Sequence, residues 1–147
     1  MRTILVGLLT LVMMACSPDP ESSTHGREER SVISAQVLAH QRVKDEQVIR
    51  VLADAGSDLS RPHSLEHDFV CPNRAAAEPV VAWGRAAGYE PSPISDGEWK
   101  GRAYAYFDLV KSTVPKIANI TPQTTSMLEV AEWYGIEYDG WGCEVVR

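Results

Sequence analysis

The sequence has little positive charge, few aromatic residues and few cysteines. Its 14 Lys and Arg residues are outnumbered by 20 Asp and Glu, the formal net charge is −6, and 7% of the residues are aromatic. An acidic protein repels phosphate backbones, so this balance disfavours direct nucleic-acid binding and favours a protein partner with a basic surface. Hydrophobic residues at 44% and charged residues at 23% are typical of one globular domain with a modest core.

Patterns typical of catalysis are also missing. The chain has no G-x-S-x-G motif and no Cys–His pair at a recognisable spacing. His63, Glu66 and His67 match H-x-x-E-H, so a metal-dependent hydrolase is an alternative function. That motif requires a helix, whereas on a strand its two histidines would lie about 13 Å apart, too far to share one zinc ion. We therefore expect a non-enzymatic protein without a cofactor or metal.

The one long apolar run lies at the N-terminus. Residues 4–14 are apolar apart from Gly7 and Thr10, which is too short to span a bilayer but typical of a secretion signal. Ala15-Cys16 follows directly and resembles the lipobox of bacterial lipoproteins, in which the cysteine is acylated after cleavage, although Met13 stands where Leu is usual. Ordinary signal cleavage and an uncleaved anchor are the alternatives.

We therefore predict a signal peptide over residues 1–15 and a lipid on Cys16. Residues 16–30 have the Pro, Ser, Gly and mixed-charge composition of a tether. Ser17 follows the lipidated cysteine, which in enteric-type sorting favours the outer membrane. The expected location is the cell envelope, with the domain facing the periplasm.

Residues 31–55 have mostly helical spacing of apolar residues, with Ser31 or Ser34 as cap and Gly56 as stop. Two roles are open for this amphipathic helix: packing on its own domain, or binding a partner helix. The apolar positions assigned to its inner face are Val32, Leu38, Val43, Val48, Val51, Leu52 and Ala55.

Residues 62–147 have the pattern of an α+β core. Asn73 is expected to cap the first helix, and Pro79 predicts either a kink there or a later start near Glu78. Thr121-Pro122 is expected to open the second helix and Gly135 to close it. The predicted strands are 64–70, an edge strand 89–94, 99–114 and a last strand from residue 136, with a turn at 95–97.

This order most simply builds a ferredoxin-like fold, with a four-stranded antiparallel sheet and two helices on one face. The predicted spatial order is 4-1-3-2, which places the last strand at an edge beside strand 64–70. In that arrangement Cys71 and Cys143 lie at opposite ends of neighbouring strands, on the order of 20 Å apart. A disulfide requires Cα atoms within about 7 Å, so both thiols are expected to be free.

The last strand is unusual because it contains two glycines two residues apart. Strict alternation places Tyr138, Gly140 and Gly142 on one face, where the helices can approach closely, and Glu137, Asp139 and Trp141 on the other. An edge bulge at Gly140, or a hairpin turn at Asp139-Gly140, would explain the same residues.

The segment Glu137-Tyr138-Asp139-Gly140-Trp141-Gly142 resembles the C-terminal signature of the regulator of ribonuclease activity B family. The similarity extends over roughly residues 45–147, including Gly56-Ser57-Asp58, Leu65-Glu66-His67 and Gly88-Tyr89-Glu90. It implies a ferredoxin-like binding protein without a catalytic site, whose family activity is inhibition of the endoribonuclease E. That ribonuclease is cytoplasmic, so an export signal implies either a different partner in the envelope or a misread signal.

The open face of the predicted sheet is the candidate binding surface. It combines carboxylates with aromatic side chains, which suits a partner rich in Lys and Arg. The alternative is that these are solvated polar residues and that Trp141 is ordinary edge packing. The predicted partner-binding residues are Glu66, Asp68, Tyr104, Tyr106, Glu137, Asp139 and Trp141, with Asp108 on the same face.

Overall fold

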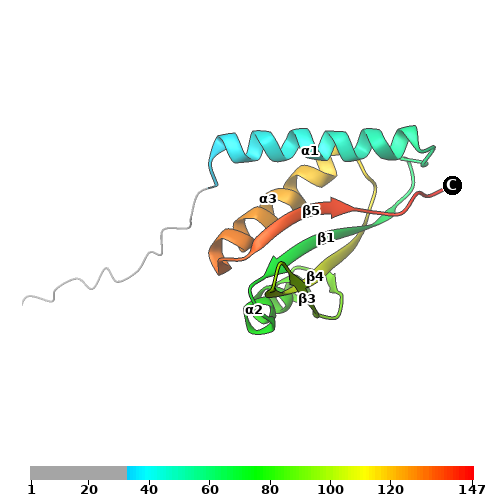
Figure 1. Cartoon of the computed structure of the whole chain (residues 1–147). Helices are drawn as coiled ribbons and strands as arrows, with labels where there is room; N and C mark the ends of the chain where they lie inside the picture. Colours follow the sequence, from blue (N-terminus) through cyan, green and yellow to red (C-terminus); the bar gives the residue numbers. More distant parts are fainter. Residues whose placement is uncertain (1–32) are drawn as a thin grey trace, which may run out of the picture.

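The computed structural model describes residues 33–147, which form three helices and an antiparallel sheet (Figure 1). The predicted signal peptide, Cys16 and the tether lie outside these residues. Within residues 33–147, no helix is both long and apolar enough to cross a membrane. The elements are α1 (Ala35–Asp54), β1 (His63–Cys71), α2 (Arg74–Ala86), β2 (Glu90–Pro91), β3 (Ser95–Trp99), β4 (Arg102–Thr113), α3 (Ile117–Tyr134) and β5 (Glu137–Gly142).

The strand order β2-β4-β1-β5 confirms the predicted ferredoxin-like sheet. β1 and β4 are its two central strands, paired without interruption from His63 opposite Thr113 to Cys71 opposite Ala105. β5 pairs with the other side of β1 and forms one edge of the sheet. Both Cys71 and Cys143 are free, as predicted, because they lie at opposite ends of the neighbouring antiparallel strands β1 and β5.

The other edge differs from the prediction, because residues 95–99 form the strand β3 and not a turn. The chain reverses instead at Lys100 and Gly101, between Trp99 and its partner Arg102. Both residues have positive φ, 49° and 75°, which is the requirement of a two-residue type I′ hairpin. The edge strand predicted over residues 89–94 is consequently reduced to Glu90–Pro91, and β2 and β3 pair with successive parts of β4.

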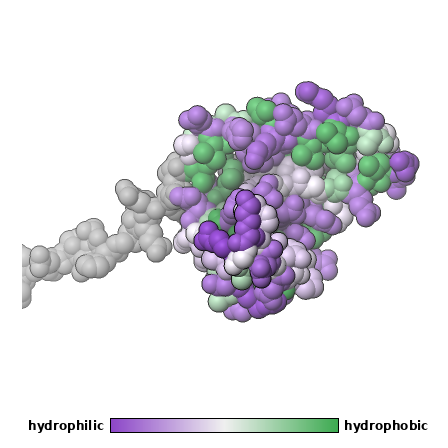
Figure 2. Space-filling model, viewed as in Figure 1, coloured by the Kyte–Doolittle hydropathy of each residue, from purple (hydrophilic) through white to green (hydrophobic). Residues whose placement is uncertain are grey.

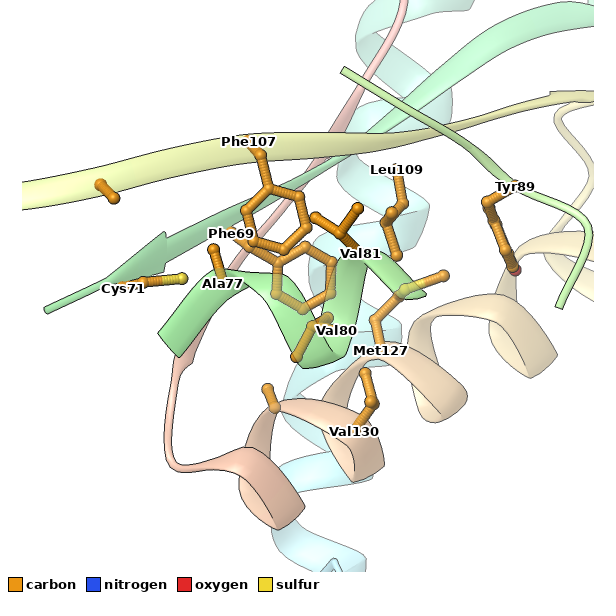
Figure 3. Close-up of a cluster of buried hydrophobic side chains, with 12 residues drawn as sticks. Phe69, Cys71, Ala77, Val80, Val81, Tyr89, Phe107, Leu109, Met127 and Val130 are labelled. Carbon is orange, nitrogen blue, oxygen red and sulfur yellow. The ribbon is translucent and has the colours of Figure 1, made fainter. Parts of the chain in front are cut away.

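The hydrophobic core lies between the sheet and the helices α2 and α3 (Figure 3). The alternation predicted for β1 and β4 is confirmed, since Leu65, Phe69, Phe107 and Leu109 are all buried on the helix side. The rings of Phe69 and Phe107 stack with centroids 5.2 Å apart across the two central strands. Val80 and Val81 of α2, together with Met127 and Val130 of α3, pack on this pair of strands.

The helix α2 begins at Arg74, so the alternative start near Glu78 is wrong. Asn73 caps it as predicted, accepting a hydrogen bond from the Ala76 N–H at 3.0 Å. Pro79 is inside the helix and lacks the N–H that would bond to the carbonyl of Ala75. Ala75 is exposed, so water can satisfy that carbonyl and the helix continues.

The helix α3 begins at Ile117, one turn before the predicted start, so the assignment of Thr121 as its cap is wrong. Lys116 precedes the helix without a side-chain cap, and Pro122 lies inside it. The Thr121 hydroxyl is buried without a hydrogen-bond partner. The predicted stop is confirmed, because Gly135 takes the left-handed conformation with φ 64°.

Gly84 sets the distance between α2 and the sheet. A Cβ atom added to it would lie 2.5 Å from Leu109 Cδ2, and Leu109 is fully buried, so its side chain cannot move aside into solvent. We expect Gly84→Ala to lower the free energy of unfolding by about 2 kcal/mol through overpacking, as measured by urea denaturation. In a Leu109→Val background the same substitution should cost clearly less, and an equal cost in both backgrounds would contradict this contact as its cause.

Candidate protein-binding face

The sheet face opposite the helices is open, as Figure 1 shows, and its centre is acidic. Glu66 and Asp68 project from β1 on the side opposite its buried residues. Asp68 lies directly opposite Asp108 of β4. Glu137 of β5 pairs with Val70 at the end of the same face, and Asp139 is exposed beside it. We call these five carboxylates, Glu66, Asp68, Asp108, Glu137 and Asp139, the acidic face.

Two negative charges opposite each other on neighbouring strands, here Asp68 and Asp108, are unfavourable. The pKa of Asp68 is raised to about 7, chiefly by burial and in addition by a hydrogen bond with Asp108 and by the charges of Asp108, Asp139 and Glu66. Near neutral pH Asp68 therefore carries a proton for part of the time. A cationic group brought to this pair would replace that proton.

No cationic side chain of residues 33–147 neutralises the acidic face. The ion pairs in this part of the chain, Arg42–Glu46 at 3.2 Å and Arg74–Asp96 at 2.7 Å, lie elsewhere. Carboxylates that are left unpaired on a folded surface attract basic partners and accelerate their association. The acidic face is therefore a surface with a net negative field at its centre.

Aromatic side chains lie beside the acidic face on β3 and β4. The rings of Tyr104 and Tyr106 are 5.9 Å apart, and Tyr106 is exposed. Tyr104 covers Gly97 of the neighbouring strand β3, where an added Cβ would lie 2.4 Å from the ring, so this position requires glycine. Trp99 is 67% exposed at the tip of the hairpin. Large, rigid side chains of this kind are typical anchors at protein interfaces.

Trp141 is not on the open face, contrary to the prediction. Asp68 pairs with Gly140 and Phe69 with Tyr138, so Asp139 is an extra residue in β5. The alternative of a bulge is therefore correct, and Gly140 takes the positive φ of 129° that the bulge requires. One extra residue reverses the alternation that follows, so Tyr138 and Trp141 both point towards the helices. Gly140 and Gly142 are opposite Asp68 and Glu66 on the open face, and a Cβ added to either would meet nothing within 4 Å, so the predicted close approach of the helices to these glycines is wrong. Trp141 is only 6% exposed.

The buried Trp141 holds α1 on the domain through Asp45. The indole Nε1–H of Trp141 donates to Asp45 Oδ1 at 3.0 Å, and the Gln41 amide donates to the same oxygen at 2.8 Å. The Thr124 hydroxyl of α3 donates to Asp45 Oδ2 at 2.8 Å. Asp45 is fully buried, and these three donors satisfy its carboxyl oxygens in the interior. We call these four residues the Asp45 cluster.

This cluster shows that α1 packs on its own domain, which decides between the two roles left open by the sequence. The predicted inner face of the helix was partly wrong, since Val43 and Val51 are 52% and 66% exposed. Figure 2 shows hydrophobic residues on the surface along the course of α1. The buried positions are Gln41, Asp45 and Leu52, with Val48 and Ile49 packed beside Leu52. Because the inner face contains the polar residues Gln41 and Asp45, the spacing of hydrophobic residues alone did not predict which face of α1 packs on the domain.

Two histidines of β1 are also buried on the helix side, while Glu66 between them faces the opposite way. His63 bonds to Ser57 Oγ at 2.6 Å and to the Arg61 carbonyl at 2.9 Å. The H-x-x-E-H residues are thus on a strand, as predicted, and do not converge. Across residues 33–147, no group of three His, Cys, Asp or Glu side chains is placed to hold a metal ion.

His67 joins β1 to β5 and α3 by two hydrogen bonds. The Gln123 amide nitrogen donates to Thr113 Oγ1 and the Asn119 carbonyl, so its Oε1 accepts from His67 Nε2–H at 3.2 Å. His67 Nδ1 must then accept from the Tyr138 hydroxyl at 3.0 Å. Burial is the main cause that lowers the pKa of His67 to about 4, against the opposing effects of Gln123 and Asp45, while Lys111 lowers it further.

The residues that sequence reasoning missed are Asp45, Gln41 and Thr124. The available signal was spacing, because positions 41, 45 and 52 fall on one helical face with Val48 and Ile49. Of the seven predicted partner-binding residues, the structure brings Glu66, Asp68, Tyr104, Tyr106, Glu137 and Asp139 to the open side of the sheet. The signature segment from Glu137 to Gly142 mainly builds the bulge and the bonds that secure α1 and β1.

The sequence is similar to a family of known proteins. The family model "Regulator of ribonuclease activity B" matches residues 42–143. The regulator of ribonuclease activity B of Proteus mirabilis is 30% identical over 106 residues, covering 71% of this chain and 74% of the relative. Its counterpart in Aeromonas hydrophila is 31% identical over 96 residues, covering 65% and 83%. With the fold and the signature in place, these matches show that the chain belongs to the regulator of ribonuclease activity B family.

Proposed function

We propose that this protein is a non-catalytic, lipid-anchored regulator that binds the basic surface of a protein partner in the cell envelope. The observation that carries the binding role is the acidic face, which has exposed aromatic side chains beside it and no cation to neutralise it among residues 33–147. Its family supports regulation by protein binding, since its relatives carry the name of regulators of ribonuclease activity.

The lipid anchor is supported by residues 1–16, with their apolar run followed by Ala15-Cys16. The test is fractionation of wild type and Cys16→Ala, combined with metabolic labelling by a fatty acid. We expect wild type to be acylated and found with membranes, and Cys16→Ala to lose the label. Wild type found unlabelled in the cytoplasm would overturn the anchor.

Regulation of a cytoplasmic ribonuclease is the second candidate, because the family match covers residues 42–143, which include most of α1 and the whole sheet. It requires residence in the cytoplasm, so the fractionation experiment separates the two candidates directly. A further defined probe is purified endoribonuclease E, tested for binding and for inhibition of RNA cleavage. Inhibition by a chain that stays in the cytoplasm would make the second candidate the function.

The binding face can be tested whatever the compartment. We expect Glu66→Gln/Glu137→Gln/Asp139→Asn to weaken partner binding by about tenfold or more, because each removed carboxylate lowers the attraction to a basic surface. A photocrosslinker at Tyr106 captures the partner, with a crosslinker at the exposed Val43 on α1 as its position control.

The matched control for that triple variant removes the same three charges elsewhere. Asp54→Asn/Glu78→Gln/Glu129→Gln changes exposed residues on the three helices and should leave the dissociation constant within about twofold of wild type. Binding by wild type should also weaken with added salt. Equal affinity of the two triple variants would exclude the acidic face as the binding surface.

A further inference from the structure

Two stacked aromatic side chains at the C-terminal end of α3 are not used by the core or by the acidic face. Trp133 is 60% exposed and Tyr134 41% exposed, and their rings stack with centroids 6.2 Å apart. Neither side chain belongs to the hydrophobic clusters of residues 33–147. Rings that combine an apolar body with one polar atom are enriched where proteins meet the surface of a bilayer.

The position of this pair relative to the N-terminal segment suggests what covers it. Figure 1 shows that α3 ends at the same end of the molecule at which α1 begins, while the C-terminus lies at the opposite end. Ile33 and Val37 line a groove together with Leu128 and Ile136, immediately beside the last turn of α3. The segment that leads to Cys16 therefore joins the domain at the aromatic end.

Chain length limits how far this end can be from a lipid on Cys16. Even fully extended, residues 16–32 span no more than about 60 Å. The opposite end of the domain lies about 30 Å beyond this one, the length of α1 with its 20 residues. A lipid on Cys16 would therefore hold the aromatic end nearer to the membrane, on average, than the opposite end.

We propose that Trp133 and Tyr134 form a lipid-contact site that seats this end of the domain on the bilayer surface. The inference rests on the proposed lipid anchor. Exposed Glu129 and Glu137 nearby would repel anionic lipids, so the lipid surface that fits is zwitterionic. Glu137 lies at this end of the acidic face, whereas Asp68 and Glu66 pair with Gly140 and Gly142 further along β5, so the centre of the face stays open to a protein partner.

The test uses the mature chain, residues 16–147, attached at Cys16 to phosphatidylcholine vesicles through a maleimide lipid. Cys143→Ser is introduced so that Cys16 is the accessible thiol, because Cys71 is buried. Brominated acyl chains quench tryptophan fluorescence on contact. We expect quenching of wild type relative to unbrominated vesicles, and loss of at least half of that quenching in Trp133→Phe.

The matched control is Trp99→Phe, which removes an equally exposed indole on the β3–β4 hairpin and should retain the full quenching. Thermal unfolding of each variant checks that the fold is intact. Equal quenching in wild type and Trp133→Phe, or no quenching at all, would overturn the lipid-contact site. Since the attachment is chemical, this result does not depend on whether cells acylate Cys16, which mass spectrometry of the native protein decides separately.

Discussion

Replacing Asp45 by alanine is expected to lower the free energy of unfolding by about 4 kcal/mol. The substitution removes the acceptor of three buried donors, from Gln41, Thr124 and Trp141. Each donor left without a partner in the interior costs about 1–3 kcal/mol, and these costs come on top of the cavity. Urea denaturation followed by circular dichroism measures the loss.

The neighbouring residue provides the control. Glu46 is exposed and pairs with Arg42 on the surface of the same helix, so Glu46→Ala should cost less than about 0.5 kcal/mol. Asp45→Asn should fall between the two, because its amide keeps one acceptor oxygen but points an NH₂ group at a donor. A loss below about 1 kcal/mol for Asp45→Ala would show that the Asp45 cluster does not hold α1.

A double-mutant cycle tests the structural explanation of the C-terminal signature. Trp141→Phe keeps a ring in the pocket but removes the Nε1–H that bonds to Asp45. If the two residues act together, the double variant Asp45→Ala/Trp141→Phe should be more stable than the sum of the single losses predicts. Limited proteolysis within α1 should accelerate in the same variants, because the helix leaves the domain before the sheet unfolds.

The sequence predicted those parts of the fold in which a pattern of neighbouring residues follows directly from a single physical requirement, such as burial of one face or capping of a helix end. Alternation in β1 and β4 follows from burial of one sheet face, and the helix ends at Asn73 and Gly135 follow from capping. The strand order followed from short, right-handed connections. The acidic face was predicted from the same alternation, because its residues are the complement of the buried ones.

The parts that were not predicted depend on tertiary contacts. A single inserted residue at Asp139 turns Trp141 from the open face into the core, and period-two counting cannot detect it without the partner strand. The inner face of α1 contains Gln41 and Asp45, which are favourable there only because Thr124 and Trp141 complete their hydrogen bonds. The spacing of hydrophobic residues therefore predicted Val43 and Val51 as buried positions, although both are exposed.

The second large effect concerns pH and centres on His67. Its pKa is about 4 in the folded protein and 6.5 in the unfolded chain, because burial disfavours the charged ring. Between these values the unfolded chain binds more protons, so the stability that His67 provides is complete above pH 6.5 and is lost as the pH falls towards 4. The loss is on the order of 3 kcal/mol. Protonated Nδ1 can no longer accept from Tyr138.

Asp68 acts in the opposite direction over an overlapping range. Its pKa is raised from 3.8 to about 7, mainly by burial, so the folded protein holds a proton that the unfolded chain has released. Its contribution to stability therefore decreases as the pH rises from 4 to 7. In wild type the two slopes partly cancel, which would make stability change little across this interval although two groups titrate.

Single variants should separate the two slopes. In Asp68→Asn the free energy of unfolding should rise steeply from pH 4 to 6.5, because only His67 remains. In His67→Gln it should fall over pH 4 to 7, because only Asp68 remains, and the variant should lose the low-pH destabilisation. Urea denaturation at a series of pH values measures both. On β1, His67 lies on the buried side of the sheet and Asp68 on the opposite side, so the two groups should titrate independently and with opposite effects on stability. Parallel curves of unfolding free energy against pH for the two variants would contradict this assignment.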